Sequence, residues 1–125
     1  MKIEISELKG MALNWAVAKA EGLDVHLKDY SDVGQCLCFW PDSESESVEY
    51  SPSTDWEQCG SLIEKYQIYL FNEALPEGHA WSASYPESVP TDYGDGETPQ
   101  IAVCRAVVNK KLDYVIDIPD EFIQS

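Results

Sequence analysis

The clearest structural signal of the chain is the stretch Thr98-Pro99-Gln100-Ile101-Ala102-Val103-Cys104-Arg105-Ala106-Val107-Val108-Asn109-Lys110-Lys111. Threonine is a favoured N-cap residue, and the proline after it suits the first helical position. Apolar residues then recur at helical spacing, and the two final lysines oppose the negative end of the helix dipole. The stretch therefore predicts a helix that is capped by Thr98 and ends near Lys111.

Two more helices are predicted on the N-terminal side of this one. Ser6 is a candidate N-cap for a helix over residues 7–20, and Gly22 suits its C-terminal end. Residues 53–55 supply hydroxyl and carboxylate capping groups for a helix over residues 55–66.

Six short segments have the alternation or the apolar runs that are typical of strands. They are residues 2–5, 23–28, 35–40, 68–72, 79–85 and 114–118. Turn residues between the middle segments favour hairpins. Hairpins that are interspersed with helices predict an α+β fold, a mainly antiparallel sheet packed with about three helices. At 125 residues we expect one domain over residues 1–125.

The charge of the chain is strongly one-sided. The formal net charge is -15, and between Pro41 and Cys104 there are 13 acidic residues and one basic residue, Lys65. The chain is also 44% hydrophobic, which indicates a folded domain with acidic surfaces rather than a disordered tail. Because affinity for nucleic acids depends on lysine and arginine, we expect no direct binding to DNA or RNA.

Membranes and oxidising compartments are also disfavoured. The acidic surface repels anionic lipids, and the longest apolar run, Cys36 to Trp40, is far too short to span a bilayer. The first residues lack the apolar core of a secretory signal. We therefore expect a cytoplasmic protein with four reduced thiols, and the cysteines are Cys36, Cys38, Cys59 and Cys104.

Two acidic loops, at about 42–50 and 86–97, hold the candidate partner-binding residues. These candidates are Asp42, Glu44, Glu46, Glu49, Glu87, Asp92, Asp95 and Glu97. One interpretation is a surface that binds a basic host or phage protein, and an alternative is a mimic of nucleic acid that inhibits a host protein. The competing interpretation is that the loops only solubilise the chain.

Metal and catalytic motifs are weak. Residues 92–97 gather three carboxylates around two glycines, yet they lack the spacing of an EF-hand calcium loop. Cys36 and Cys38 form a single tight pair, whereas structural zinc sites usually have two pairs. Only His26 and His79 are available as the usual general base for a nucleophile. We expect no metal, no cofactor and no catalysis, with a small thiol- or metal-dependent enzyme as the second alternative.

The tryptophans are interpreted as core residues. Trp40, Trp56 and Trp81 lie in or beside predicted strands and helices, and Trp56 is expected to begin the buried stripe of the helix over residues 55–66. An exposed tryptophan within an apolar patch would instead indicate a docking site.

Three stretches together resemble a known family. The first is Ile5-Ser6-Glu7-Leu8 running into Asn14-Trp15-Ala16-Val17-Ala18-Lys19-Ala20-Glu21-Gly22. The second is Ser51-Pro52-Ser53-Thr54-Asp55-Trp56 with Gly60 and Leu62-Ile63-Glu64-Lys65-Tyr66. The third is Thr98-Pro99-Gln100-Ile101-Ala102-Val103 with Arg105-Ala106-Val107-Val108. The pattern resembles the ninX-type family of phage and prophage proteins of unknown function. The last two stretches are also similar to a phage domain described as an α-β-α sandwich. The resemblance implies a phage accessory protein and supplies no catalytic residues. With the charge, it favours a non-catalytic protein-binding module.

Overall fold

The computed structural model of the chain describes residues 1–30, 34–40, 46–76, 78–85, 93–112 and 115–123. These residues mix helices and antiparallel strands, so the predicted α+β class is confirmed. The helices are α1 (Gly10–Glu21), α2 (Trp56–Tyr66) and α3 (Pro99–Lys111), with 3-10 turns η1 (Ile5–Glu7) and η2 (Asp120–Phe122). The strands are β1 (Lys2–Glu4), β2 (His26–Tyr30), β3 (Gly34–Phe39), β4 (Val48–Glu49), β5 (Tyr69–Leu75), β6 (Gly78–Ser84), β7 (Tyr93–Gly96) and β8 (Val115–Asp117).

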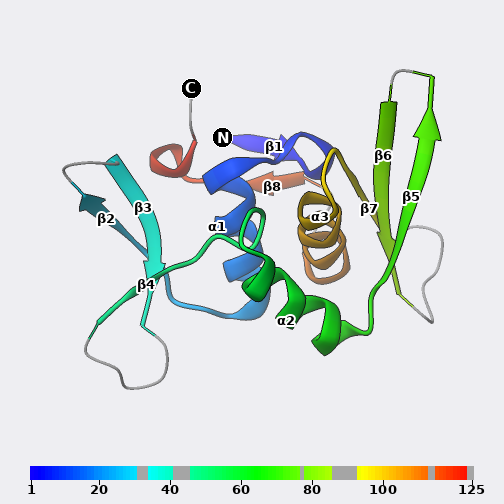
Figure 1. Cartoon of the computed structure of the whole chain (residues 1–125). Coiled ribbons are helices and arrows are strands. Elements are labelled where there is room, and N and C mark those ends of the chain that lie inside the picture. The colour runs from blue at the N-terminus through cyan, green and yellow to red at the C-terminus, as the bar shows by residue number, and fades with distance from the viewer. Residues whose placement is uncertain (31–33, 41–45, 77, 86–92, 113–114, 124–125) are drawn as a thin grey trace.

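The strands are divided over three small sheets, each antiparallel. Their strand orders are β1-β8, β2-β3-β4 and β5-β6-β7. Helices α1 and α3 pack together in the centre, with the β2-β3-β4 sheet beside α1 and the β5-β6-β7 sheet beside α3 (Figure 1). The helices therefore lie between the sheets, which is the reverse of the layering in a helix-sheet-helix sandwich.

The composition of the two central helices explains this layering. Both are buried on more than one side, and their buried residues are Ala12, Leu13, Asn14, Ala16, Val17 and Ala18 in α1 and Gln100, Ala102, Val103, Cys104, Ala106, Val107 and Val108 in α3. A helix that is apolar on several sides needs cover on each of them. In the described parts of the chain, no helix is long and apolar enough to cross a bilayer.

Helix α3 packs on β7 at unusually short range because β7 contributes glycines. A Cβ atom at Gly94 would lie 2.3 Å from the backbone nitrogen of Ala106, and one at Gly96 would lie 2.8 Å from that of Ala102. Only a residue without a side chain fits such a contact. The Tyr-Gly-Asp-Gly sequence of β7 has low strand propensity, which is why residues 93–96 were predicted as part of an acidic loop. That prediction is wrong for these residues, since β7 pairs with β6.

The side chain of Arg105 joins α3 to two other segments. Its Nε and Nη2 donate to the carbonyl oxygen of Leu8 at 3.1 and 2.8 Å, and its Nη1 donates to the carbonyl oxygen of Asp95 at 2.8 Å. Burial lowers the pKa of the guanidinium, and the nearby carboxylates of Glu97 and Asp95 act in the opposite direction. An arginine remains charged in proteins, so this half-buried cation uses its donors on backbone carbonyls.

The helix predicted over residues 7–20 begins later. Ser6 belongs to the η1 turn instead of capping a helix, and α1 starts at Gly10, whose φ of 59° turns the chain between the two. The end is as predicted, because Gly22 is left-handed at φ 72° and donates its N–H to the carbonyls of Ala18 and Lys19.

Two elements of the first sheet also differ from the prediction. β2 spans His26–Tyr30 and not residues 23–28, because its register is set by pairing with β3 and not by apolar alternation. Residues 48 and 49 fall within the predicted acidic loop, yet they form β4 and pair with β3. Residues 42–45 of that loop lie outside the described residues.

Helix α2 is bounded as predicted. The Asp55 side chain accepts hydrogen bonds from the backbone nitrogens of Glu57 and Gln58 at 2.9 and 3.3 Å. Its buried residues are Cys59 and Leu62, whereas Trp56 is 56% exposed. The predicted buried stripe is therefore wrong at Trp56.

We expect Gly94→Ala to destabilise the fold and Gly60→Ala to stabilise it. The first change places a methyl group against the α3 backbone and should lower the free energy of unfolding by about 1–3 kcal/mol. The second lies inside α2 with no atom within 4 Å of the new Cβ, and should raise that free energy by about 0.5–1 kcal/mol. Urea denaturation measures both. Equal stability of the two variants would contradict the close contact between β7 and α3.

Candidate protein-binding surface

The β5-β6-β7 sheet has one face against α3 and one face toward solvent. Alternate residues of a strand point to opposite faces. Leu70, Ala83 and Gly94 are aligned on the helix side, and Gly94 contacts α3 directly. We call the opposite side the outer face, and the residues that the register assigns to it are Tyr69, Phe71, Glu73, Ala80, Ser82, Ser84 and Asp95.

Two aromatic side chains dominate the outer face. Tyr69 is 52% exposed and Phe71 is 56% exposed, and their ring centroids lie 6.5 Å apart. Their cross-strand neighbours, Ser84 and Ser82, are too small to cover the rings. Burial of apolar surface is worth roughly 25 cal/mol per Å², and aromatic residues are enriched at protein interfaces. The pair therefore provides an apolar contact area that the fold itself leaves uncovered.

The charge around these rings is negative. Glu73 and Asp95 are exposed on the outer face, and the exposed Glu97 follows β7 directly. Strands β5, β6 and β7 contain no lysine or arginine in their sequences. Two exposed aromatic rings with carboxylates nearby are complementary to a surface that combines basic and apolar groups.

The sequence-predicted acidic residues do not gather in one place. Among the described ones, Glu46 and Glu49 are exposed next to β3, whereas Asp95 and Glu97 are exposed beside α3. Their two sheets lie on opposite sides of the α1–α3 pair (Figure 1). The remaining four candidates lie outside the described residues, and they are Asp42, Glu44, Glu87 and Asp92.

Three residues of the outer face were not among the predicted partner-binding residues, and they are Tyr69, Phe71 and Glu73. Residues 68–71 are Ile-Tyr-Leu-Phe, so both faces of the strand carry apolar side chains and no alternation marks the exposed one. The only available signal was Glu73, two residues beyond Phe71 on the same face.

Half of the basic residues are held at the C-terminal ends of the helices. Lys65 Nζ donates to Glu21 Oε1 at 2.9 Å, and the Tyr66 hydroxyl donates to the other oxygen of the same carboxylate. Lys110 lies 4.4 Å from the ring centroid of Tyr85. Cations at these positions oppose the negative ends of the helix dipoles. These contacts lie at helix ends, away from the outer face, whereas Arg105 is the basic residue whose pKa burial lowers and the carboxylates of Glu97 and Asp95 raise.

Two tryptophans are exposed on the other side of the molecule. Trp40 is 53% exposed and stacks on the ring of His26 at a centroid distance of 4.2 Å, and Trp56 is 56% exposed. The interpretation of these two as core residues is therefore wrong. Trp81 is half-buried and packs against the core. Trp40 follows β3, the central strand of the β2-β3-β4 sheet, and Trp56 begins α2, so neither belongs to the outer face.

The thiols lie mainly in the core. Cys38, Cys59 and Cys104 are buried, and Cys36 is partly exposed. Burial raises the pKa of Cys59 to about 11 and raises that of Cys104 well above its ordinary value. A protonated thiol is a poor nucleophile and a poor metal ligand. In the ranges that the structure describes, no three histidine, cysteine or acidic side chains are grouped as metal ligands would be.

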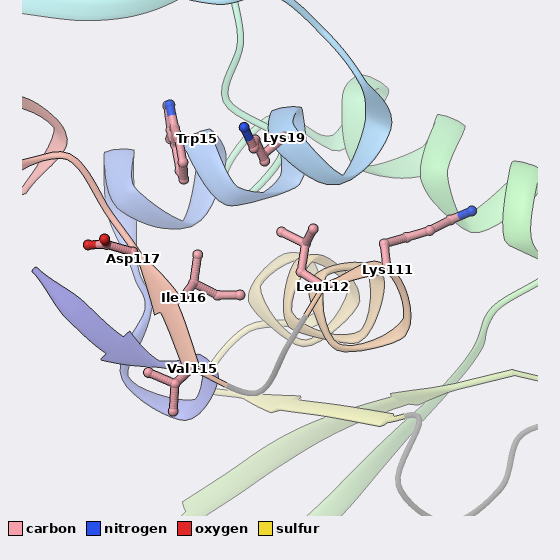
Figure 2. A pocket seen from close by; sticks show the side chains of 7 residues that line it. All are labelled: Trp15, Lys19, Lys111, Leu112, Val115, Ile116 and Asp117. Atoms are coloured by element: carbon pink, nitrogen blue, oxygen red, sulfur yellow. The ribbon is translucent and has the colours of Figure 1, made fainter.

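One concavity of about 410 Å³ lies between α1, the end of α3 and β8. It is lined by Trp15, Lys19, Lys111, Leu112, Val115, Ile116 and Asp117 (Figure 2). The Lys111 amine points away from it, and lies 5.5 Å from the ring centroid of Tyr66. Asp117 accepts a hydrogen bond from the N-terminal amine at 3.1 Å, and Trp15 stacks on Phe122. Because these groups contact the protein itself, the concavity holds no convergent set of polar groups.

We expect one of the four thiols to react before the others. At about pH 8 a thiol of pKa about 11 is ionised in roughly one molecule per thousand, so Cys59 should react slowly, as should Cys104. Cys36 should react first because it is partly exposed. Titration with a thiol reagent should find four thiols in denaturant and one faster thiol in the native protein. Cys36→Ser should remove the fast phase, and its survival in that variant would contradict this assignment.

Comparison with known proteins gives one family match. The family described as Bacteriophage P22, NinX matches residues 4–111, which include all three stretches quoted in the sequence analysis. Among curated proteins, none matches the chain significantly. The resemblance inferred from the sequence is therefore confirmed.

Proposed function

The chain belongs to the NinX family of bacteriophage P22 and is a phage accessory protein; we propose that it acts by binding a basic protein and not by catalysis. The proposed partner is a host or phage protein of the host cytoplasm. The outer face of the β5-β6-β7 sheet is the proposed contact surface.

A single observation carries this proposal: two exposed aromatic rings stand on a sheet face whose charged groups are all acidic. Tyr69 and Phe71 supply apolar area, and Glu73 and Asp95 supply charge. Long-range attraction from a chain of net charge -15 speeds the encounter with a cationic protein, and the rings then provide contact area that charge alone does not. The buried thiols, with their raised pKa values, give no support to the alternative of a thiol-dependent enzyme.

The mimic of nucleic acid is a special case of the same proposal. In that case the partner is itself a DNA- or RNA-binding protein, and the acidic surface occupies its phosphate-binding site. The four described acidic candidates lie beside two different sheets, so one continuous row of charges is not supported for them. Addition of duplex DNA to the complex tests this special case, since DNA must compete for a mimicked phosphate-binding site.

We expect the protein to retain basic proteins from a lysate of its natural host at about 0.05 M salt and to release them at about 0.5 M salt. Two variants locate the surface. The outer-face variant carries Tyr69→Ser, Phe71→Ser, Glu73→Gln and Asp95→Asn. The loop variant carries Asp42→Asn, Glu44→Gln, Glu46→Gln and Glu49→Gln. It therefore has the same number of substitutions as the outer-face variant, placed in the first acidic loop.

The outer-face variant should lose specific capture, while the loop variant should retain most of it. Both should keep the wild-type circular dichroism spectrum, because the altered residues of the described ranges are exposed. Loss of capture in the loop variant alone would move the binding surface to the first acidic loop. Equal capture by both variants and by the wild type would refute the proposed function of the outer face.

A further inference from the structure

We propose that the partner binds as an extended, lysine- or arginine-rich segment that adds a strand to the free edge of β5. This inference rests on the proposed function of the outer face and specifies how the partner is held. It follows from the position, regularity and charge of β5.

β5 is the edge strand of its sheet. The sheet order is β5-β6-β7, and in the described residues β5 pairs with β6 alone. For the residues drawn as ribbon, Figure 1 shows no other strand or helix along the outer side of β5. Residues 71–74 are exposed although they alternate between both faces, so this half of the strand projects beyond α3. Within the described ranges, the backbone groups along this edge are therefore left for another chain to pair with.

The hydrogen-bond register identifies those groups. Leu75 pairs with Gly78, two residues separate them in the sequence, and the pair that closes a hairpin of that length is hydrogen bonded. Because hydrogen-bonded pairs alternate along an antiparallel ladder, Tyr69, Phe71 and Glu73 direct their N–H groups toward β6. The N–H and C=O groups of residues 70, 72 and 74 point to the free edge.

This edge lacks the usual protection against strand addition. Natural edge strands are kept short, bulged, or supplied with lysine or proline. β5 has seven residues in continuous register with β6, without a bulge, and its sequence contains neither lysine nor proline. Addition of a strand to such an edge is a recurring mode of peptide recognition.

Charge selects the occupant. A second copy of the chain would bring a further net charge of -15 and would set the Glu73 carboxylates of two β5 strands close together. A segment with lysine or arginine on one face instead places cations next to Glu73. The alternate residues of that segment can then be apolar and pack along β5. Like-charge repulsion therefore disfavours self-pairing, while opposite charge favours a basic segment.

The test uses two synthetic peptides of about ten residues, a length that covers a typical strand. The first alternates lysine and valine, and the second has the same sequence with N-methyl groups on alternate backbone nitrogens, so that it keeps the charge and loses the strand ladder. Fluorescence anisotropy at low salt measures their affinities. The unmethylated peptide should bind at least about tenfold more tightly.

A substitution at the free edge provides the matched control. Asn72→Pro removes an N–H that points away from β6, a position at which an edge strand tolerates proline. Asn72→Thr keeps the N–H at the same position. Asn72→Pro should abolish the difference between the peptides, and Asn72→Thr should preserve it. In the wild type, hydrogen exchange at the amides of residues 70, 72 and 74 should slow when the unmethylated peptide binds.

Equal affinity for both peptides, or absence of binding to either at low salt, would overturn the strand-addition proposal. Retention of the lysate partners by Asn72→Pro at the wild-type level would do the same and would leave the outer face as a binding surface that acts through side chains alone. Loss of self-association in Asn72→Pro, if the wild type is a dimer by light scattering, would assign the edge to a second copy and also overturn the proposal.

Discussion

The close packing of β7 on α3 is the constraint on which the rest of the structure depends. Gly94 and Gly96 allow the backbone of the strand to approach that of the helix at Ala102 and Ala106. Arg105 then fixes the contact from the helix side, because its guanidinium donates to the carbonyls of Leu8 and Asp95. One side chain thus ties α3 to the segment before α1 and to the strand that carries the outer sheet.

The orientation of the outer face is a consequence of that contact. Once the glycines of β7 face α3, the period of two in a strand turns Asp95 to the solvent side. The same register, passed through β6, turns Tyr69, Phe71 and Glu73 to that side as well. The acidic and aromatic character of the face is therefore fixed by the packing of glycines, and not by any preference of these side chains for one another.

The local signals in the sequence predicted much of the fold, and the missing parts have identifiable causes. The caps at Thr98 and Asp55 and the glycine at Gly22 are local chemistry, and the helix ends that depend on them were predicted. Strand β7 was not, because its glycines are selected by contact with α3 and not by strand propensity. The arrangement of sheets around the two central helices was also not predicted. It depends on which sides of α1 and α3 are covered by other elements, and the sequence of a single segment does not determine that.

The candidate site was predictable only in its sign of charge. The excess of carboxylates indicated a cationic partner. The contact surface, however, was predicted on two loops, because most of the acidic residues between Pro41 and Cys104 are concentrated there in the sequence. The outer face was not predicted because residues 68–71 are all apolar, so the sequence does not show which face of the strand is buried. Only tertiary packing determines that Leu70 points toward α3 and Phe71 toward solvent. Exposure of Trp40 and Trp56 was missed for the same reason.

The contact between β7 and α3 can be measured in solution by nuclear Overhauser spectroscopy of the unmodified protein. An Hα atom of Gly94 takes the direction in which a Cβ would meet the Ala106 nitrogen. The account predicts strong cross-peaks from the Gly94 Hα atoms to the Ala106 amide, together with cross-peaks from Gly96 to Ile101. If those cross-peaks are absent while α3 and β7 are both formed, the packing described here is wrong, and with it the orientation of the outer face.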